Sequence, residues 1–305
     1  MPHEAMTPGT AEMFRLVASL PEQLTESAGL PGLDAVGALP PGCRRIILCG
    51  LGGSAIAGDL VRPLIAGSGL SLTVHRDYGL PAWAAPGDLA LCSSYSGDTE
   101  ETLSAARAAA DHGLARVVIS TGGQLGAMAG ADGLRMITLP PGLPPRASLG
   151  YGLGALVRLL GAWGLVPDTG DQMESAIAHL RACNASRGVS AGDGRVEDPA
   201  GHTPLADLAR ALVGRTAVIH TAGDIGHPAG VRLRAQINEN SKRPACLASY
   251  PDLDHNELEG WSLTPEERDR FALIILKGPD PEPRMAQRIA VTRDLLAPEF
   301  AAVHE

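Results

Sequence analysis

The sequence has 305 residues, of which 34 are acidic and 25 are basic, so its formal net charge is −9. This length is enough for two ordinary domains with buried cores. The acidic balance and the lack of a long basic stripe argue against a general nucleic-acid-binding protein. Because no secretory leader and no apolar run of membrane-spanning length occur, we expect a cytoplasmic protein that contacts neither nucleic acid nor membrane.

The five cysteines include no Cys-x-x-Cys pair, which argues against a zinc site or a disulfide framework. Several of them lie in apolar, strand-like runs, where a free cysteine behaves as a small hydrophobic residue. Aromatic residues make up only 3% of the chain, so the cores must be built mainly from aliphatic side chains.

Short apolar runs alternate with helical stretches through the first half of the chain. A helix is predicted over residues 10–20, where apolar residues recur at helical spacing. Beyond a segment rich in proline and glycine, strands are predicted at 45–49, 70–74, 89–92, 116–119 and 135–138. Helices are predicted at 55–65, 100–112 and 124–129. Strands that alternate with helices indicate βαβ units and a mostly parallel sheet.

A second α/β region follows two further predicted helices, at 149–163 and 171–185. The polar, glycine-rich segment 186–202 is interpreted as a linker. Strands are then predicted at 216–220, 244–248 and 271–276, and helices at 229–238, 265–270 and 283–296. We therefore predict an α/β protein with an N-terminal helix and first domain over 1–165, a helix and linker over 166–202, and a second, shorter domain over 203–305.

The segment GLGGSAIAGD at 50–59 follows the first predicted strand. Parallel sheets bind ligands at the carboxyl ends of their strands, and Gly52 and Gly53 would let the backbone approach a ligand there. The next helix offers N–H groups to an anion, and Ser54 adds a hydroxyl. Three interpretations of this glycine loop remain open: a phosphate ester site, a dinucleotide site or a structural turn. The dinucleotide is considered because GLGGSA satisfies G-x-G-x-x-A.

A second loop, SSYSGDT at 93–99, is unusually rich in hydroxyl groups. Asp98 or Thr99 is expected to cap the helix that follows. Capping needs one hydroxyl, whereas this hydroxyl loop also supplies Ser94 and Ser96, and each hydroxyl can donate to a different phosphoryl oxygen. The loop therefore favours a phosphate ester over a dinucleotide, and the alternative is an N-cap among ordinary surface serines.

The two loops together resemble the sugar isomerase (SIS) domain, a phosphosugar-binding fold. The rest of the chain is similar to the bifunctional phosphoglucose/phosphomannose isomerase family, in the same order and over nearly its whole length. The matching segments are PEQL at 21–24, GLGGSAIAGD at 50–59, HRDYGLP at 75–81, SYSGDTEET at 94–102, PPRASLGY at 144–151, QINENSKRPA at 236–245 and DHNELEGW at 254–261.

This resemblance implies two SIS-type domains, each a mostly parallel sheet flanked by helices. It implies an isomerase that interconverts glucose 6-phosphate and mannose 6-phosphate with fructose 6-phosphate through an enediolate. Glu239 would move the proton between C1 and C2, and His255 would help open the sugar ring from the neighbouring subunit of a homodimer. Arg146 would stabilise the enediolate or position the substrate. The resemblance implies no metal or organic cofactor.

The resemblance is weaker at the C-terminus. Family members continue into further helices with a lysine that reaches back into the site, whereas no lysine follows Lys277 here. We therefore expect a sugar phosphate to bind, with isomerisation slow or absent in this form. A non-catalytic phosphosugar-binding sensor is the alternative function, and a nicotinamide-dependent enzyme is a weaker alternative.

Overall fold

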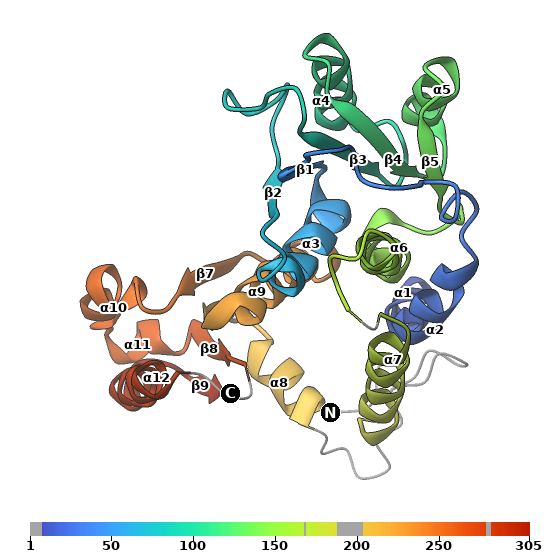
Figure 1. The fold of residues 1–305 in the computed structure, drawn as a ribbon. Helices are drawn as coiled ribbons and strands as arrows, with labels where there is room; N and C mark the ends of the chain where they lie inside the picture. The colour runs from blue at the N-terminus through green and yellow to red at the C-terminus, as the bar shows by residue number, and fades with distance from the viewer. Residues whose placement is uncertain (1–7, 168, 188–203, 279–281) are drawn as a thin grey trace. The chain divides into compact units, whose positions relative to one another are not determined.

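The computed structural model describes residues 8–167, 169–187, 204–278 and 282–305. The chain divides into two compact units, Met1–Glu197 and Asp198–Glu305, each built on its own sheet. Figure 1 traces the elements along the chain, and each unit is described by itself below.

Five parallel strands form the sheet of the first unit, in the order β2-β1-β3-β4-β5. Their bounds are β1 (Arg45–Cys49), β2 (Ser71–His75), β3 (Leu89–Ser94), β4 (Ala115–Ser120) and β5 (Arg135–Thr138). The central strand β3 is buried along its whole length. A continuous apolar run is typical of a parallel strand that is covered on both faces.

Helices cover both faces of this sheet. The helices α3 (Gly52–Val61) and α6 (Leu149–Ala162) lie on one face, and α4 (Glu100–Asp111) and α5 (Gly123–Ala131) lie on the other (Figure 1). Successive side chains of β1 alternate between these layers, since Ile46 packs in the first core cluster and Ile47 packs in the second. The first unit is therefore a three-layer α/β/α structure.

The N-terminal helices pack outside this layered core. The helices α1 (Pro8–Ala18) and α2 (Leu20–Glu26) precede the sheet, and α2 packs on α6 and on α7 (Thr169–Ser186) through Leu24, Met173 and Ile177. Most of the linker predicted at 186–202 falls outside the described residues, so the predicted domain boundaries stay predictions. Short 3₁₀ turns occur at η1 (Ser27–Gly29), η2 (Arg62–Ile65) and η3 (Pro145–Ala147).

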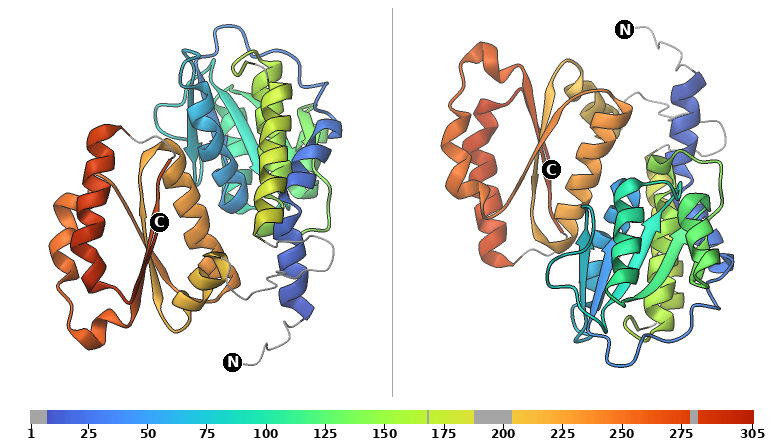
Figure 2. Two further views of the ribbon diagram at one scale, coloured as in Figure 1. Left: turned by 90° about the horizontal axis from the view of Figure 1, so that it is seen from below. Right: turned by 90° about the horizontal axis from the view of Figure 1, so that it is seen from above.

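Four parallel strands form the second sheet, in the order β7-β6-β8-β9. They are β6 (Thr216–Thr221), β7 (Ala245–Ser249), β8 (Phe271–Leu276) and β9 (Ala302–His304). One face is covered by α8 (Pro204–Leu212) and α9 (Gly223–Asn240). The other is covered by α10 (Leu253–Asn256), η4 (Leu258–Trp261) and α12 (Pro283–Leu296), and Figure 2 shows this sheet between α12 and α9. The remaining elements are α11 (Pro265–Arg268) and η5 (Ala297–Glu299).

The predicted α/β class with two mostly parallel sheets is confirmed. The helix predicted at 229–238 begins earlier, at Gly223, because this glycine has a φ of +79° and the chain turns into the helix directly after β6. All five cysteines are free, and Cys49 and Cys92 are buried in the second core cluster of the first unit, as expected for small hydrophobic residues. No helix in the described part of the chain has the length and apolar character needed to cross a membrane.

Candidate active site

The glycine loop and the hydroxyl loop leave the first sheet side by side. Their strands, β1 and β3, are parallel neighbours with Cys49 opposite Cys92. The loops approach so closely that a Cβ atom added to Gly50 would lie 2.7 Å from the carbonyl oxygen of Ser93. A side chain at this position would force the loops apart, so glycine is required there for the two loops to meet.

The glycine loop forms the first turn of α3. The helix begins at Gly52, which has a φ of +51° and is exposed, and a Cβ added there would point into open space. Gly53 and Ser54 complete this turn. The amide of Ser54 donates to the Leu51 carbonyl at 3.1 Å, which leaves the N–H groups of Gly52 and Gly53 at the open start of the helix. These groups and the helix dipole make the turn suitable for binding an anion. Gly52, Gly53 and Ser54 thus share one exposed, amide-rich turn.

The hydroxyl loop holds its side chains in one connected network. Ser94 is buried, and its Oγ lies 2.8 Å from Thr99 Oγ1 and 3.5 Å from Ser96 Oγ. Ser94 Oγ also accepts from the amide of Gly97 at 3.1 Å, while Ser96 Oγ accepts from the amide of Asp98 at 3.2 Å. Ser96 is exposed and Thr99 is partly exposed, so these two hydroxyls remain accessible to a ligand.

The predicted side-chain cap of α4 is wrong in its mechanism. Thr99 is the N-cap residue with extended backbone, but no side-chain hydrogen bond caps the helix. The Thr99 hydroxyl instead pairs with Ser94, and Asp98 Oδ1 accepts from the amide of Gln124 at 3.0 Å. Both candidate caps are occupied within the loops, so the polar groups there hold the loop in shape rather than the helix end.

A third loop, between β4 and α5, supports the hydroxyl loop from the side. Gly97 has a φ of +77°, and a Cβ added there would lie 1.9 Å from the carbonyl oxygen of Gly122. A Cβ added to Gly123 would likewise lie 2.4 Å from the carbonyl oxygen of Ser96. The buried Ser120 donates to the Gly122 carbonyl at 3.0 Å and thereby fixes the supporting loop.

Arg146 lies on the turn η3, beside the glycine loop. A Cβ added to Gly53 would be 3.2 Å from the carbonyl oxygen of Pro145, so the turn contacts the start of α3. The buried Gln23 of α2 holds this turn, since its Nε2 donates to the Ala147 carbonyl at 2.8 Å and its Oε1 accepts from the Gly150 amide at 3.0 Å. The structure thus brings the Arg146 turn to the phosphate-binding loops predicted from the sequence.

Glu239 lies at the C-terminal end of α9 in the second unit and is exposed. Arg232 lies close enough to Glu239 for their charges to interact. Burial lowers the pKa of Arg232, and the Glu239 carboxylate partly opposes this shift. The ammonium of Lys242 donates to the backbone carbonyl of Glu239 at 2.6 Å. The end of α9 therefore places the Glu239 carboxylate among positively charged side chains.

His255 lies on α10, a single helical turn of the second unit, and its side chain is exposed. The preceding residue, Asp254, points inward and receives hydrogen bonds from α12. Glu239 and His255 therefore both belong to the second unit, whereas the two loops and Arg146 belong to the first. Within the described residues, no group of three or more histidine, cysteine, aspartate or glutamate side chains could hold a metal ion.

Comparison with known proteins gives matches over almost the whole chain. A model of the bacterial phospho-glucose isomerase C-terminal SIS domain matches residues 202–305. The bifunctional phosphoglucose/phosphomannose isomerase of Caldicellulosiruptor bescii is 32% identical over 294 residues, which cover 96% of this chain and 85% of that protein. This chain belongs to the bifunctional phosphoglucose/phosphomannose isomerase family. A second member, from Aquifex aeolicus, is 31% identical over 255 residues, covering 83% of this chain and 73% of its own.

Solved structures agree with the SIS fold of this isomerase family member. The C-terminal domain of glucosamine-fructose-6-phosphate aminotransferase from Francisella tularensis has a TM-score of 0.67 at 13% identity. The superposition covers 100% of this chain and 84% of that one. At this level of identity the likeness shows the fold alone, so the function must be argued from the site and from the family.

The sequence alone assigned no role to three residues that hold segments carrying candidate site residues of this isomerase family member. Gln23 lies within the PEQL segment, but its partners are 124 and 127 residues away in the sequence. Ser120 ends a buried strand, and Asp254 precedes His255 in the DHNE segment. In the sequence, each of these residues is visible only as a polar residue within an apolar or motif-rich segment. That pattern does not identify the residue with which it forms a hydrogen bond.

Proposed function

We propose that this family member interconverts glucose 6-phosphate and mannose 6-phosphate with fructose 6-phosphate. The observation that carries the proposal is the pair of loops at the carboxyl edge of the first sheet. An amide-rich helix start and a set of hydroxyls meet there, with an arginine-bearing turn beside them. This arrangement suits a phosphate dianion, because each oxygen can accept from a different donor and charge-assisted hydrogen bonds contribute roughly 1.5–3 kcal/mol each.

In the proposed reaction the first unit holds the phosphate through Gly52, Gly53, Ser54, Ser96 and Thr99. Ser94 keeps the hydroxyl loop in shape from its buried position. The anchored phosphate places the sugar chain at the edge of the sheet, and this positioning lowers the entropic cost of the proton transfer.

The proton-transfer chemistry is assigned to the other candidate residues. His255 assists ring opening, so that the sugar presents a free carbonyl. Glu239 removes the proton from C2 of the aldose and returns it to C1, while the proton of the C2 hydroxyl passes to the C1 oxygen, giving the ketose. Proton transfer by a positioned base typically contributes 10²- to 10⁴-fold. The guanidinium of Arg146 stabilises the negative oxygen of the enediolate between the two transfers.

We also propose a cytoplasmic homodimer in which His255 of one subunit completes the site of the other. The exposed position of His255 on its own unit supports this arrangement, since a catalytic imidazole needs a surrounding site to fix it. The non-catalytic sensor is less favoured, because the relatives that match over most of the chain carry the names of isomerases.

A coupled assay of fructose 6-phosphate formation from glucose 6-phosphate and from mannose 6-phosphate tests the proposal. We expect slow turnover by the wild-type protein and at least tenfold weaker sugar phosphate binding by a Ser96→Ala/Thr99→Ala variant that remains folded, with only a modest fall in its melting temperature. Ser71→Ala, which removes an exposed hydroxyl elsewhere in the first unit, is the control. Unchanged affinity of the double variant would reject the phosphate site, and binding without any turnover would favour the sensor.

A further inference from the structure

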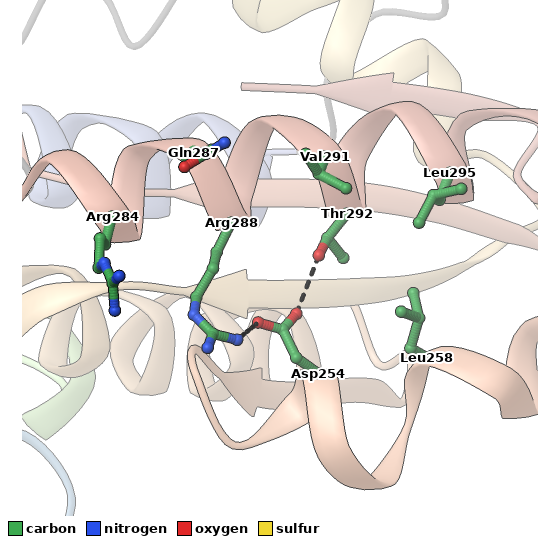
Figure 3. A pocket seen from close by; sticks show the side chains of 8 residues that line it. All are labelled: Asp254, Leu258, Arg284, Gln287, Arg288, Val291, Thr292 and Leu295. Atoms are coloured by element: carbon green, nitrogen blue, oxygen red, sulfur yellow. Dashed lines mark hydrogen bonds and ion pairs between the residues drawn. The ribbon is translucent and has the colours of Figure 1, made fainter.

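A groove in the second unit separates the helix α12 from the segment that carries His255. Figure 3 shows this groove, with Arg288 and Thr292 reaching from α12 toward Asp254 on α10. The groove is lined by Asp254, Leu258, Arg284, Gln287, Arg288, Val291, Thr292 and Leu295. The contact across it joins residues more than thirty positions apart in the sequence, so it ties α10 to the 14-residue helix α12.

Asp254 is bound through both of its carboxylate oxygens. Oδ1 accepts from the Thr292 hydroxyl at 2.9 Å, and Oδ2 accepts from Nη1 of Arg288 at 3.2 Å. The Asp254 side chain is only 10% exposed, and Thr292 is buried. Burying a carboxylate costs free energy unless its oxygens accept hydrogen bonds. Two donors from α12 provide one hydrogen bond to each oxygen of Asp254.

The segment that carries His255 cannot hold its own shape. The helix α10 has only four residues, and a single turn is not stable in isolation. Its inward side is fixed by Leu253, which is buried in the core, and by Asp254, which binds α12. The next residue, His255, is exposed. The direction of its imidazole depends on how this turn is anchored, to which Leu253 and Asp254 both contribute.

We propose that Asp254, held by Thr292 and Arg288, is a positioning residue for His255. The inference rests on the proposed function, in which His255 acts on the sugar ring. Leu253 fixes the depth of α10 by apolar burial, which is not directional. The two hydrogen bonds to Asp254 are directional, so they set the rotation of the turn and with it the direction of His255. Asp254 itself faces α12 and contributes no group to the substrate.

The first test uses Thr292→Val, which keeps the shape of the side chain and removes the hydroxyl donor. In the wild-type background we expect kcat/KM to fall roughly 3- to 10-fold, since the coupling between interacting residues is of this size. In a His255→Ala background the same substitution should have no further effect. The fall should lie mainly in kcat, because the phosphate contacts that hold the ground state are on the first unit.

Gln287→Ala is the matched control, because Gln287 lines the same groove next to Arg288 and has no hydrogen bond to Asp254. Equal losses from Thr292→Val with and without His255 would show a merely structural role and overturn the proposal. So would a His255→Ala protein with full isomerase activity.

A second measurement decides the anchoring even if the proposed isomerase activity fails. The ring Cε1–H signal of His255 is assigned by its loss in the His255→Ala protein. We expect this signal to shift in Thr292→Val, 37 positions away in the sequence, and further in Arg288→Met/Thr292→Val, and to stay in place in Gln287→Ala. An unmoved signal in a folded double variant would overturn the proposal whatever the enzymatic result.

Discussion

Gly97 controls the shape of the hydroxyl loop through its backbone alone. Its positive φ costs any other residue roughly 1–2 kcal/mol, and a Cβ would also strike the Gly122 carbonyl. We predict that Gly97→Ala lowers the melting temperature clearly and abolishes measurable binding of a hexose 6-phosphate. The loss of binding follows because the hydroxyls of Ser96 and Thr99 move with the loop.

Gly113→Ala separates the clash at Gly97 from the backbone strain. Gly113 also has a positive φ, of +68°, but a Cβ there would meet nothing within 4 Å. We expect this variant to lose only the strain contribution and to bind the sugar phosphate normally. If both variants bind normally, the packing of the hydroxyl loop against the loop at Gly122 is not required for the site.

The sequence allowed the candidate phosphate-binding residues to be proposed because they are consecutive. Gly52, Gly53 and Ser54 follow one apolar strand, and Ser94 to Thr99 lie at the end of another, so local pattern and parallel topology are sufficient to place the two loops side by side. Gln23 and Asp254 could not be assigned their roles in this way. Their partners are set by how distant helices pack, and a single sequence carries no signal for that pairing.

The second sheet has an unusual buried polar group, His220 in β6. Both ring nitrogens lack a hydrogen-bond partner, and the ring packs edge-on against Tyr250 at 5.8 Å. Burial lowers the pKa of His220 from 6.5 to about 4, and the nearby Asp254 carboxylate only partly opposes this. Between these two pH values the histidine is therefore neutral in the folded protein and protonated in the unfolded chain.

This shift predicts a loss of stability in mild acid. Between pH 6.5 and about 4 the unfolded state binds more protons than the folded state, so stability falls as the pH falls. The full loss at the acid end is about 3 kcal/mol for this one group. His220→Phe should flatten this dependence while keeping the ring contact with Tyr250. The measurement is the free energy of unfolding in denaturant at each pH from 7 to 4, with hydrogen exchange of the β6 and β8 amides reporting on the second unit.

The control for this prediction is His255→Phe, which changes an exposed histidine in the same unit. It should keep the wild-type pH dependence of stability. Equal acid sensitivity of the His220→Phe and wild-type proteins would mean that other groups cause the loss.

The elements that could be predicted were those with strong local patterns. The strands β1, β5 and β8 have the predicted bounds, since each is an apolar run with a clear stop. The strand β9 has three residues and α10 has four, which is too short for any periodicity to appear. Such short elements exist because the core on which they pack stabilises them, and the core is known only from the fold.

At the scale of the whole molecule, the proposed shared site can be tested by mixing inactive subunits. Glu239→Gln and His255→Ala proteins should each show little activity alone. If His255 serves the site of the neighbouring subunit, exchange produces heterodimers in which one site keeps both residues, so part of the activity returns. Subunit exchange is checked by mass spectrometry. If exchange occurs and no activity returns, the result argues against the shared site.

In the proposed reaction, Glu239 moves a proton between C1 and C2 of a hexose 6-phosphate. The most direct measurement incubates the protein with glucose 6-phosphate in D₂O and follows the C1 and C2 hydrogens by proton NMR. We predict that the wild-type protein introduces solvent deuterium at these carbons and that Glu239→Gln does not, although it binds the sugar phosphate equally well. A wild-type protein that binds glucose 6-phosphate and mannose 6-phosphate yet neither exchanges these hydrogens nor forms fructose 6-phosphate would contradict this mechanism.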